Sequence, residues 1–585
     1  MRITRPRVIA AVALLVALAA LLAWRVTHRP AVVVAPPSSS SGVVSLRGGS
    51  LVGSIRAEPR GFDRYTGTGA TLEAITFLTQ AKLVRINRAT DQVEPWLAES
   101  WTAAPNGLAY NVKLRPALAF SDGTLFTADD VVFAFRAVYD AKTASPVGDS
   151  LRVGGKPLAV RALGPNEVEI TFPAPFGPGL RLLDNLPILP RHKLEAALDA
   201  GTLAQAWGPT TPPAEIVGLG PFILTEYHPG ERLVFLRNPR YWRKDPSGQP
   251  LPYLDRLVLE ILPDQNAELL RLLAGQLDFT QSEIRSEDYA MLSRAEQEHR
   301  VRLFDLGIGL DSDALWFNLA PAKSDDRTWL RRAEFRRAIS LAVDRHAFCD
   351  TVFLGAAEPV HGPITPGNPK WFAPDLPGGA HDAARARQML AELGLADRDG
   401  DGELDDAKGR PVRFTVLVQR GIAAAERGAA FVRDELRQVG VTMDIVGLEA
   451  GAVQGRWQSH NYDAIYQRLL VTDSDPAGNL DYWLSSGSAH VWAPGQAQPA
   501  TPWESQIDQL MQRQVASFND VERVRLFSQV QQIFADEMPA LYFAAPHLYV
   551  AVSARVVRAT PSPLRPPLLW NPEQLAAIPP VAGTN

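Results

Sequence analysis

The stretch "FSDGTLFTADDVVFAFR" at residues 120–136 combines a turn with the start of a helix. An aromatic run ends at Phe120, and residues 121–123, Ser-Asp-Gly, have the composition of a tight turn. Thr127 and Asp130 then stand at the spacing of a capping box, in which two side chains satisfy free amides of the first helical turn. The sequence therefore predicts a helix that begins after Thr127, with acidic residues that serve capping and turn formation.

Short strands are expected on both sides of this helix and in the second half of the chain. Strand-like segments occupy residues 51–56, 81–87, 111–114, 167–172, 414–418 and 441–448. Between the last two lies an amphipathic helix that stops at Gly440, so this unit reads as a strand-helix-strand crossover with a parallel sheet. A further long helix is expected over residues 519–537.

Length and composition limit the classes of protein to consider. A chain of 585 residues is too long for one core, so two or more domains are expected. The formal net charge of −5 gives no reason to expect a nucleic acid or an anionic membrane patch as partner. The single cysteine, Cys349, excludes an intramolecular disulfide and a thiolate metal cluster, and we expect it to be a small buried apolar residue.

The N-terminal segment has the layout of an export signal. Arginines at positions 2, 5 and 7 precede an apolar run from Val8 to Trp24, and residues 36–42, "PPSSSSG", read as a flexible tether. The run is near the lower length limit for a membrane-spanning helix, and no clean cleavage site follows it. We therefore expect residues 1–29 to be a signal peptide or an N-terminal membrane anchor, residues 30–46 to be a linker, and the folded body to be periplasmic or otherwise extracytoplasmic.

Residues 95–136, "PWLAESWTAAPNGLAYNVKLRPALAFSDGTLFTADDVVFAFR", resemble the signature of the bacterial extracellular solute-binding proteins of family 5. Further matching segments follow in the family's order. They are residues 48–64, residues 217–242, residues 251–279, "LWFNL" at 315–319 and "FRRAISLAVDRHAF" at 335–348. Several motifs in the right order over most of the chain make the resemblance specific.

The resemblance implies a two-lobed α/β fold, like that of type II periplasmic binding proteins, with mixed sheets flanked by helices and a hinge between the lobes. We expect the lobe 1 core to comprise residues 47–88, 215–312 and 555–585. Residues 89–214 would form an extra subdomain of lobe 1, and residues 313–554 would form lobe 2. The ligand of such a fold binds between the lobes.

The resemblance also implies a function, namely the substrate-binding component of an ABC importer. Such a protein would bind a dipeptide or oligopeptide in the cleft by lobe closure, deliver it to permease subunits in the inner membrane, and act as a monomer without a cofactor. One alternative keeps the fold and changes the ligand to a glycan fragment, a metal chelate or a modified amino acid. Another is a cleft enzyme or a signalling receptor on the same scaffold.

Five residues are candidates for ligand contact. By its position in "VTDSDPAGNLDYW" (471–483), Asp473 resembles the carboxylate with which family members bind a peptide's α-amino group. This loop is one residue shorter than the usual family motif, and Asp473 could equally cap a helix after Pro476. Trp316 and Trp483 lie beside family motifs and are candidates for the cleft wall. Trp492 is a further candidate for the cleft wall, ranked below them. Asn318 is a candidate because it belongs to the matching "LWFNL" segment.

The segment "DRDGDGELDDAK" (397–408) follows the spacing of a calcium loop. Its candidate ligands are Asp397, Asp399, Asp401, the Glu403 carbonyl and Asp405. The bidentate glutamate expected at the twelfth position is replaced by Lys408, with Asp406 as the nearby substitute. The alternative to calcium is a simple acidic turn that leads into a strand.

We expect no catalysis. The chain contains no "GxSxG" or "HExxH" motif, no phosphate-binding loop and no dinucleotide fingerprint. His490, near Ser485 and Ser488, lacks the helix and loop context of a nucleophile site.

Overall fold

The computed structural model of the protein describes residues 46–320, 327–468 and 473–578. The predicted signal peptide or anchor and nearly all of the predicted linker lie outside these residues. Within the described ranges, no helix is both long enough and apolar enough to cross a bilayer.

The core of lobe 1 is a four-stranded mixed sheet built from segments far apart in the sequence. Its strands, in spatial order, are β1 (Ser50–Ile55), β12 (Arg256–Ile261), β11 (Arg232–Arg237) and β10 (Phe222–His228). β1 pairs in parallel with β12, whereas the other two pairs are antiparallel. Leu51, Phe235 and Leu257 are fully buried, so apolar side chains hold this sheet against its neighbours.

The extra subdomain of lobe 1 is a four-stranded antiparallel sheet with helices on it. The strands are β5 (Ala98–Ala103), β6 (Ala109–Leu114), β8 (Glu167–Thr171) and β7 (Ala159–Gly164). The predicted capping box is confirmed, since α3 (Ala128–Tyr139) follows Thr127 and Asp130 Oδ2 accepts from the Thr127 amide at 2.9 Å. Asp130 Oδ1 also accepts from the Arg191 amide at 3.1 Å, which ties α3 to α5 (Arg191–Ala200).

Lobe 2 is built on a seven-stranded mixed sheet. Its path runs β13 (Val301–Ile308), β19 (Ala540–Ser553), β14 (Asp313–Phe317), β18 (Ala464–Arg468), β16 (Arg413–Gln419) and β17 (Thr442–Leu448), with β15 (Ala357–Pro359) paired to β19. The predicted crossover is confirmed, because β16 and β17 are parallel and α12 (Ala423–Arg437) joins them. The two-lobed fold with mixed sheets is therefore the observed one.

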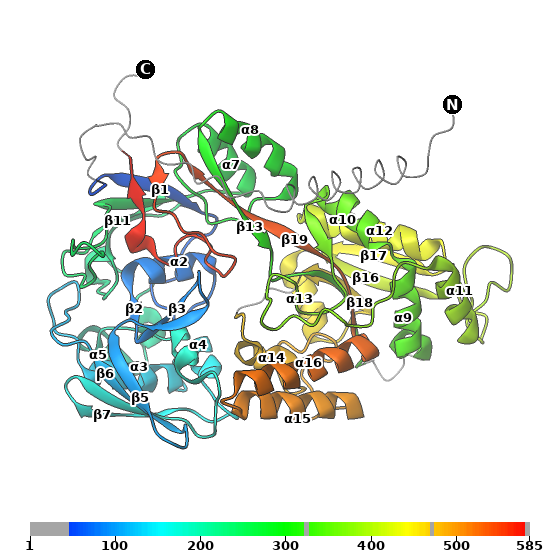
Figure 1. Ribbon diagram of the computed structural model, residues 1–585, viewed down its shortest axis with the longest axis horizontal. Coiled ribbons are helices and arrows are strands. Elements are labelled where there is room, and N and C mark those ends of the chain that lie inside the picture. The colour runs from blue at the N-terminus through cyan, green and yellow to red at the C-terminus, as the bar shows by residue number, and fades with distance from the viewer. Residues whose placement is uncertain (1–45, 321–326, 469–472, 579–585) are drawn as a thin grey trace, which may run out of the picture. The chain divides into compact units, whose positions relative to one another are not determined.

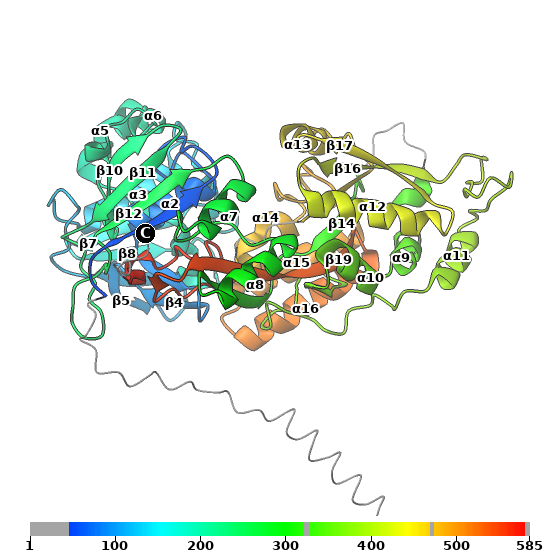
Figure 2. The same ribbon diagram turned by 90° about the horizontal axis from the view of Figure 1, so that it is seen from above.

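The strand pair β13–β19 lies between the two lobes (Figure 1). The sequence-based boundaries assign β13 to lobe 1, yet it pairs with β19 from Val301 opposite Ser553 to Ile308 opposite His547. In the same region β1 residue Gly53 and β19 residue Val552 both bridge to Phe279. The long strand β19 therefore connects the sheets of both lobes, as Figure 2 shows from above.

The remaining elements complete the two lobes. They are α2 (Ala70–Thr79), β2 (Ala81–Lys82), β3 (Val84–Asn87), β4 (Gln92–Pro95), α4 (Pro146–Ser150), η1 (Gly179–Asn185), β9 (Pro187–Ile188), α6 (Leu203–Ala206), η2 (Pro213–Glu215), α7 (Gln265–Leu273), η3 (Ser286–Asp288), α8 (Tyr289–Gln297), η4 (Thr328–Arg331), α9 (Ala333–Ala342), α10 (Arg345–Phe353), α11 (Ala383–Glu392), α13 (Ala450–Gln458), η5 (Pro476–Asn479), α14 (Leu480–Trp483), α15 (Pro502–Ala516), α16 (Asp520–Glu537), β20 (Val556–Val557), η6 (Pro572–Gln574) and β21 (Ala576–Ala577). Cys349 of α10 is buried, as predicted. The predicted helix over residues 519–537 is α16, which Asn519 caps.

A buried ion pair joins α16 to the loop that precedes η5. Arg523 donates to both carboxylate oxygens of Asp475, at 2.8 and 2.6 Å, and the two side chains are 3% and 8% exposed. Asp475 also accepts from the Ala477 amide and thereby caps η5. This pair fixes the chain two residues after Asp473.

We predict that Arg523→Met destabilises the protein by about 3–5 kcal/mol, because it leaves the Asp475 carboxylate buried without its cation. The matched control is Arg525→Met on the same helix, whose half-exposed ion pair with Glu522 is worth at most about 1 kcal/mol. Urea unfolding of both variants measures the difference. Equal losses in the two variants would contradict a structural role for the buried pair.

Candidate functional site

The candidate site is organised by η1, a short 3-10 helix of the extra subdomain. η1 carries Arg181 and Asp184, which are three residues apart. Because a 3-10 helix has three residues per turn, side chains at this spacing lie on the same face. Arg181 and Asp184 therefore point into the same region, where the C-terminal segment and lobe 2 also meet lobe 1.

Arg181 reaches across the cleft to Asp473 of lobe 2. Its Nε lies 3.0 and 3.1 Å from the two carboxylate oxygens of Asp473, and its Nη2 lies 2.5 Å from Oδ1. The side chains are 10% and 17% exposed, so the pair is largely removed from water. Burial opposes the charge on Arg181, but Asp473 and Asp91 outweigh it and raise the pKa of the guanidinium.

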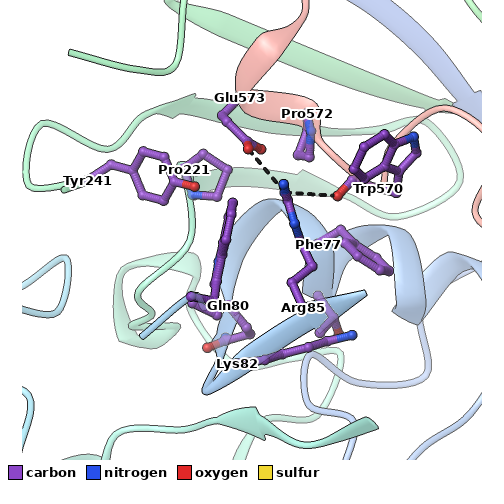
Figure 3. A pocket seen from close by; sticks show the side chains of 12 residues that line it. Phe77, Gln80, Lys82, Arg85, Pro221, Tyr241, Trp570, Pro572 and Glu573 are labelled. Carbon is purple, nitrogen blue, oxygen red and sulfur yellow. Dashed lines mark hydrogen bonds and ion pairs between the residues drawn. The ribbon is translucent and has the colours of Figure 1, made fainter. Parts of the chain in front are cut away.

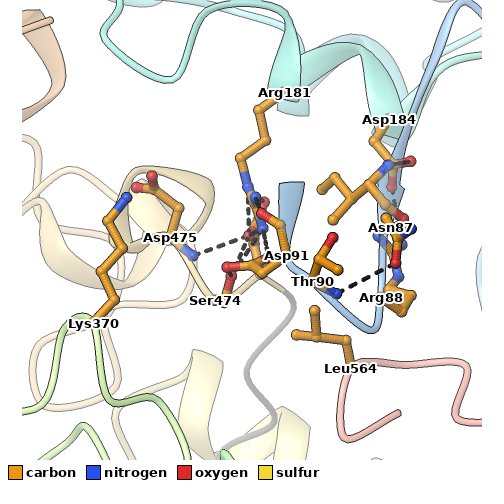
Figure 4. A network of polar contacts seen from close by, with 12 residues as sticks. Asn87, Arg88, Thr90, Asp91, Arg181, Asp184, Lys370, Ser474, Asp475 and Leu564 are labelled. Carbon is orange, nitrogen blue, oxygen red and sulfur yellow. Dashed lines mark hydrogen bonds and ion pairs between the residues drawn. The ribbon is translucent and has the colours of Figure 1, made fainter. Parts of the chain in front are cut away.

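Asp91 is a second carboxylate on the same guanidinium. Arg181 Nη2 lies 2.7 Å from Asp91 Oδ1, and the Ser474 hydroxyl donates to Asp91 Oδ2 at 2.7 Å (Figure 4). Asp91 adopts a left-handed backbone conformation with φ of 56°, which aspartate tolerates better than most residues. Two carboxylates thus share one guanidinium, and this group of three carries a formal charge of −1.

Local hydrogen bonds hold Asp473 in place. Its Oδ1 accepts from the Asp475 amide at 3.0 Å, and its backbone carbonyl accepts from the Asn479 side chain at 2.9 Å. The cap of the helix after Pro476 is Asp475, not Asp473. The Asp473 carboxylate therefore does not cap η5. Among the described contacts, its Oδ2 accepts a hydrogen bond only from Arg181 Nε.

Asp473 lies where two cavities adjoin. A cavity of about 230 Å³ is bounded mainly by polar side chains of lobe 1, and one of about 180 Å³ by largely apolar side chains of lobe 2. The first is lined by Arg64, Glu73, Thr76, Phe77, Lys82, Ile86, Arg88, Arg181, Asp184, Asn185, Pro187, Asp473, Leu564 and Arg565. The second is lined by Leu310, Ser312, Pro363, Ile364, Asp473, Ser474, Pro476, Asn479, Asp481, Tyr482, Trp483, Ala489 and Tyr542.

The other predicted contact residues fall in different places. Trp483 lines the second cavity and packs edge-on against Phe527 with ring centroids 5.1 Å apart. Trp316 is fully buried behind this wall, edge-on to Tyr482 and Tyr542, which line the cavity. The structure thus brings Asp473 and Trp483 together and places Trp316 one layer deeper.

Asn318 and Trp492 lie in polar networks inside lobe 2. The Asn318 side chain donates to the carbonyls of His460 and Tyr462, at 3.1 and 2.9 Å, and so fixes the turn before β18. Trp492 donates to Glu504 at 3.2 Å.

Glu504 also lies 3.3 Å from His490, which is fully buried and oriented by this contact. Burial opposes ionisation of Glu504, yet His490, Gln496 and Thr501 outweigh it and lower its pKa to about 2. His490 therefore belongs to a structural network.

A much smaller cavity, of about 20 Å³, lies beside the first and shares Thr76, Phe77 and Lys82 with it. Figure 3 shows Arg85 pointing to Glu573 and to the Trp570 carbonyl. The guanidinium also lies 3.6 Å from the ring centre of Trp96. These contacts tie the C-terminal segment to lobe 1.

Comparison with known proteins identifies the family to which this chain belongs. A sequence profile of the bacterial extracellular solute-binding proteins, family 5, matches residues 92–490, which is more than half of the chain. The chain belongs to this family.

Relatives of this family 5 protein bind different ligands. The chain is 25% identical to di/tripeptide-binding protein 2 of Pseudomonas aeruginosa, over 90% of this chain and 95% of that protein. It is 26% identical to heme-binding protein A of Haemophilus influenzae, over 85% and 86% of the two chains. The solved structure of the oligopeptide-binding protein AppA from Bacillus subtilis with a nonapeptide has a TM-score of 0.72 and 25% identity, covering 91% and 99% of the chains.

The sequence-based reasoning missed Arg181 and Asp91 as site residues of this family 5 protein. Arg181 lies 292 residues before Asp473 in the sequence, and no local pattern joins them. The available signal was the spacing of Arg181 and Asp184 in "GLRLLDN", which places two charges on one face of a short helical turn within an otherwise apolar segment.

The acidic loop has local partners for its carboxylates. Asp397 accepts from the amides of Gly400 and Gly402, at 2.7 and 3.1 Å, and Asp401 accepts from the Glu403 amide at 2.7 Å. Oxygens of Asp397, Asp399 and Asp401 lie within 4.8 Å of one another, and all three residues are exposed.

Two further acidic residues of the loop also accept hydrogen bonds, one from within the loop and one from β17. Asp405 accepts from the Arg398 amide at 3.2 Å, and the Glu403 side chain accepts from Thr442 at 2.8 Å. The carboxylates of Asp397, Asp401 and Asp405 therefore accept from amides of the loop itself, whereas the donor to the Glu403 side chain lies on β17.

We predict that this loop keeps its structure without calcium, because its oxygens already accept from amides of the loop itself. The melting temperature in EGTA should equal that in about 1 mM Ca²⁺, whereas a site with a Kd of about 10 µM would add about 2.7 kcal/mol of stability. Asp399→Asn serves as the control. An upward shift in Ca²⁺ that this substitution removes would contradict the prediction and establish a calcium site.

Proposed function

We propose that this protein captures a short peptide between its lobes, with the peptide's ammonium group at Asp473, and passes it to an ABC permease. Family 5 proteins are the solute-binding components of such importers, and most of them bind peptides. What remains specific to this chain is the ligand and the residues that hold it.

The observation that carries the proposal is the charge of the group around Arg181. Asp91 and Asp473 together outnumber the guanidinium by one negative charge, and Asp473 borders both cavities. A ligand ammonium beside Asp473 would balance this charge. Contacts of this kind are strong in a cleft that excludes water, because both groups are charged and the local dielectric is low.

Closure of the lobes supplies the second part of the proposal. Besides the Arg181–Asp473 pair, the amide of Gly177 in lobe 1 donates to the Val515 carbonyl of lobe 2 at 2.5 Å. A side chain at Gly177 would collide with the Ser517 carbonyl, so glycine permits this close approach. A ligand that adds contacts to both lobes shifts the population towards the closed state.

The apolar second cavity offers a place for a side chain of the peptide. Trp483, Tyr482 and Tyr542 contribute aromatic surface there, which covers ligand surface at low entropic cost. The same surface also suits a non-peptide ligand such as haem, which the Haemophilus influenzae relative binds according to its name. The negative charge at Asp473 favours a peptide over haem, because a peptide supplies an ammonium group as its partner.

The proposal includes no chemical step, because family 5 members bind and release their solute. Members of this family act outside the cytoplasm. We further propose that residues 1–29 export the chain and either leave it or remain as an anchor, and that the folded body works as a monomer. N-terminal sequencing of the mature protein distinguishes cleavage from anchoring.

We predict that Asp473→Asn weakens peptide binding by about tenfold to a hundredfold, as expected for a lost contact to a charged group. The probe is an equimolar library of dipeptides and tripeptides, and mass spectrometry measures the bound fraction after purification without denaturant. N-acetylation of the library should weaken binding to the wild type by a similar factor.

Asp434→Asn is the matched control, because this carboxylate is exposed on α12 and lies outside the cleft. It should bind the library like the wild type. Unchanged binding by Asp473→Asn, or preferential uptake of haem over every peptide, would contradict the proposal.

A further inference from the structure

A second charged group lies at the lobe 1 side of the larger cavity. Lys82, from β2, and Arg88, which follows β3, both contact one carboxylate oxygen of Asp184. Lys82 Nζ is 3.4 Å from Asp184 Oδ2, and Arg88 Nη2 is 2.9 Å from the same atom. The other oxygen, Oδ1, accepts from the Ile86 amide at 2.9 Å. Two cations therefore share a single carboxylate.

These three side chains are shielded from water. Their exposed fractions are 14% for Lys82, 9% for Arg88 and 5% for Asp184. The Phe77 ring covers the cations, with Lys82 Nζ 4.6 Å from its centre. Burial lowers the pKa of Lys82, and Asp184 offsets this only in part. A second anion near Lys82 would offset the remaining cost of burying its charge.

Arg64 adds to this positive group. It also lines the cavity, and its nearest carboxylate in the described part of the chain is Glu73, at 4.0 Å. Arg64, Lys82 and Arg88 contribute three positive charges, whereas Glu73 and Asp184 contribute two negative ones. Among these five groups the formal excess is one positive charge, and Arg565, which also lines the cavity, is paired with Glu283 and Asp311.

The two ends of the cavity thus carry opposite charge, and η1 connects them. Arg181 of η1 takes part in the negative group with Asp91 and Asp473, while Asp184 of η1 holds Lys82 and Arg88. All the charged members that line the cavity surround the same space of about 230 Å³. A ligand that fits this space is complementary to it when it carries a negative group and a positive group at opposite ends.

We propose that Lys82, Arg88 and Arg64 form a carboxylate-binding end of the cavity, so that the ligand is a short zwitterion with both termini free. This inference rests on the proposed function, because the ammonium of the same ligand meets Asp473. The ligand class is a dipeptide or tripeptide whose carboxylate lies within the cavity, and not a longer chain whose C-terminus extends beyond it. The cations come from lobe 1, whereas the ammonium partner comes from lobe 2, so such a ligand contacts both lobes.

The test compares three forms of the dipeptide and tripeptide library, namely free, C-terminally amidated and N-acetylated. The wild type should bind the free form at least about tenfold more tightly than the amidated form, as expected for loss of a charge-assisted contact. Lys82→Met should weaken binding of the free form and leave binding of the amidated form nearly unchanged. A purely structural role of Lys82 would instead weaken both forms equally.

Two variants keep the test interpretable. Arg64→Gln removes a more exposed cation of the same group and should reduce the preference for the free form in the same direction. Lys193→Met removes an exposed lysine of α5 and should leave the preference unchanged. Circular dichroism spectra that match the wild type show that each variant is folded.

The outcomes separate this inference from the proposed function. Equal affinity for free and amidated peptides, with loss of binding on N-acetylation, overturns the carboxylate-binding end and leaves the ammonium contact at Asp473 intact. Absence of binding for all three forms overturns both. A preference for the free form that Lys82→Met and Arg64→Gln reduce supports the inference.

Discussion

The ion pair between Arg181 and Asp473 is the interaction on which the cleft depends. It joins side chains 292 positions apart in the sequence and brings the extra subdomain of lobe 1 against lobe 2. Without the guanidinium, the carboxylates of Asp91 and Asp473 would face each other in a space largely closed to water, where like charges repel strongly. The same pair leaves one negative charge for a cationic partner, so a single arrangement serves both closure and recognition.

Much of the fold could be predicted because its determinants are local. Thr127 and Asp130 form a capping box from four consecutive residues, and the strand-helix-strand unit around α12 follows from its hydrophobic period and from Gly440. The family motifs gave the two-lobed architecture. The pairing of β13 with β19 could not be predicted, because it joins strands separated by more than two hundred residues and lies across the expected lobe boundary.

The same contrast between local patterns and distant contacts applies to the candidate site. Asp473 could be proposed from its position in a family loop, and Trp483 lies in the wall of the same cavity that Asp473 borders. Trp316 is equally apolar and lies beside an equally specific motif, yet it packs one layer behind the wall. The sequence pattern does not distinguish a tryptophan that lines a cavity from one that packs behind the cavity wall. Arg181 and Lys82 were missed because their meaning depends on which distant charges they meet.

Small-angle X-ray scattering of the ligand-free protein tests most directly whether the Arg181–Asp473 pair holds the lobes together. Arg181→Met should give a larger radius of gyration than the wild type, because the two carboxylates then repel each other across the cleft. Arg161→Met, which removes an exposed arginine of the extra subdomain, provides the reference for a charge change without effect on closure. Identical scattering curves for the wild type and both variants would contradict the account.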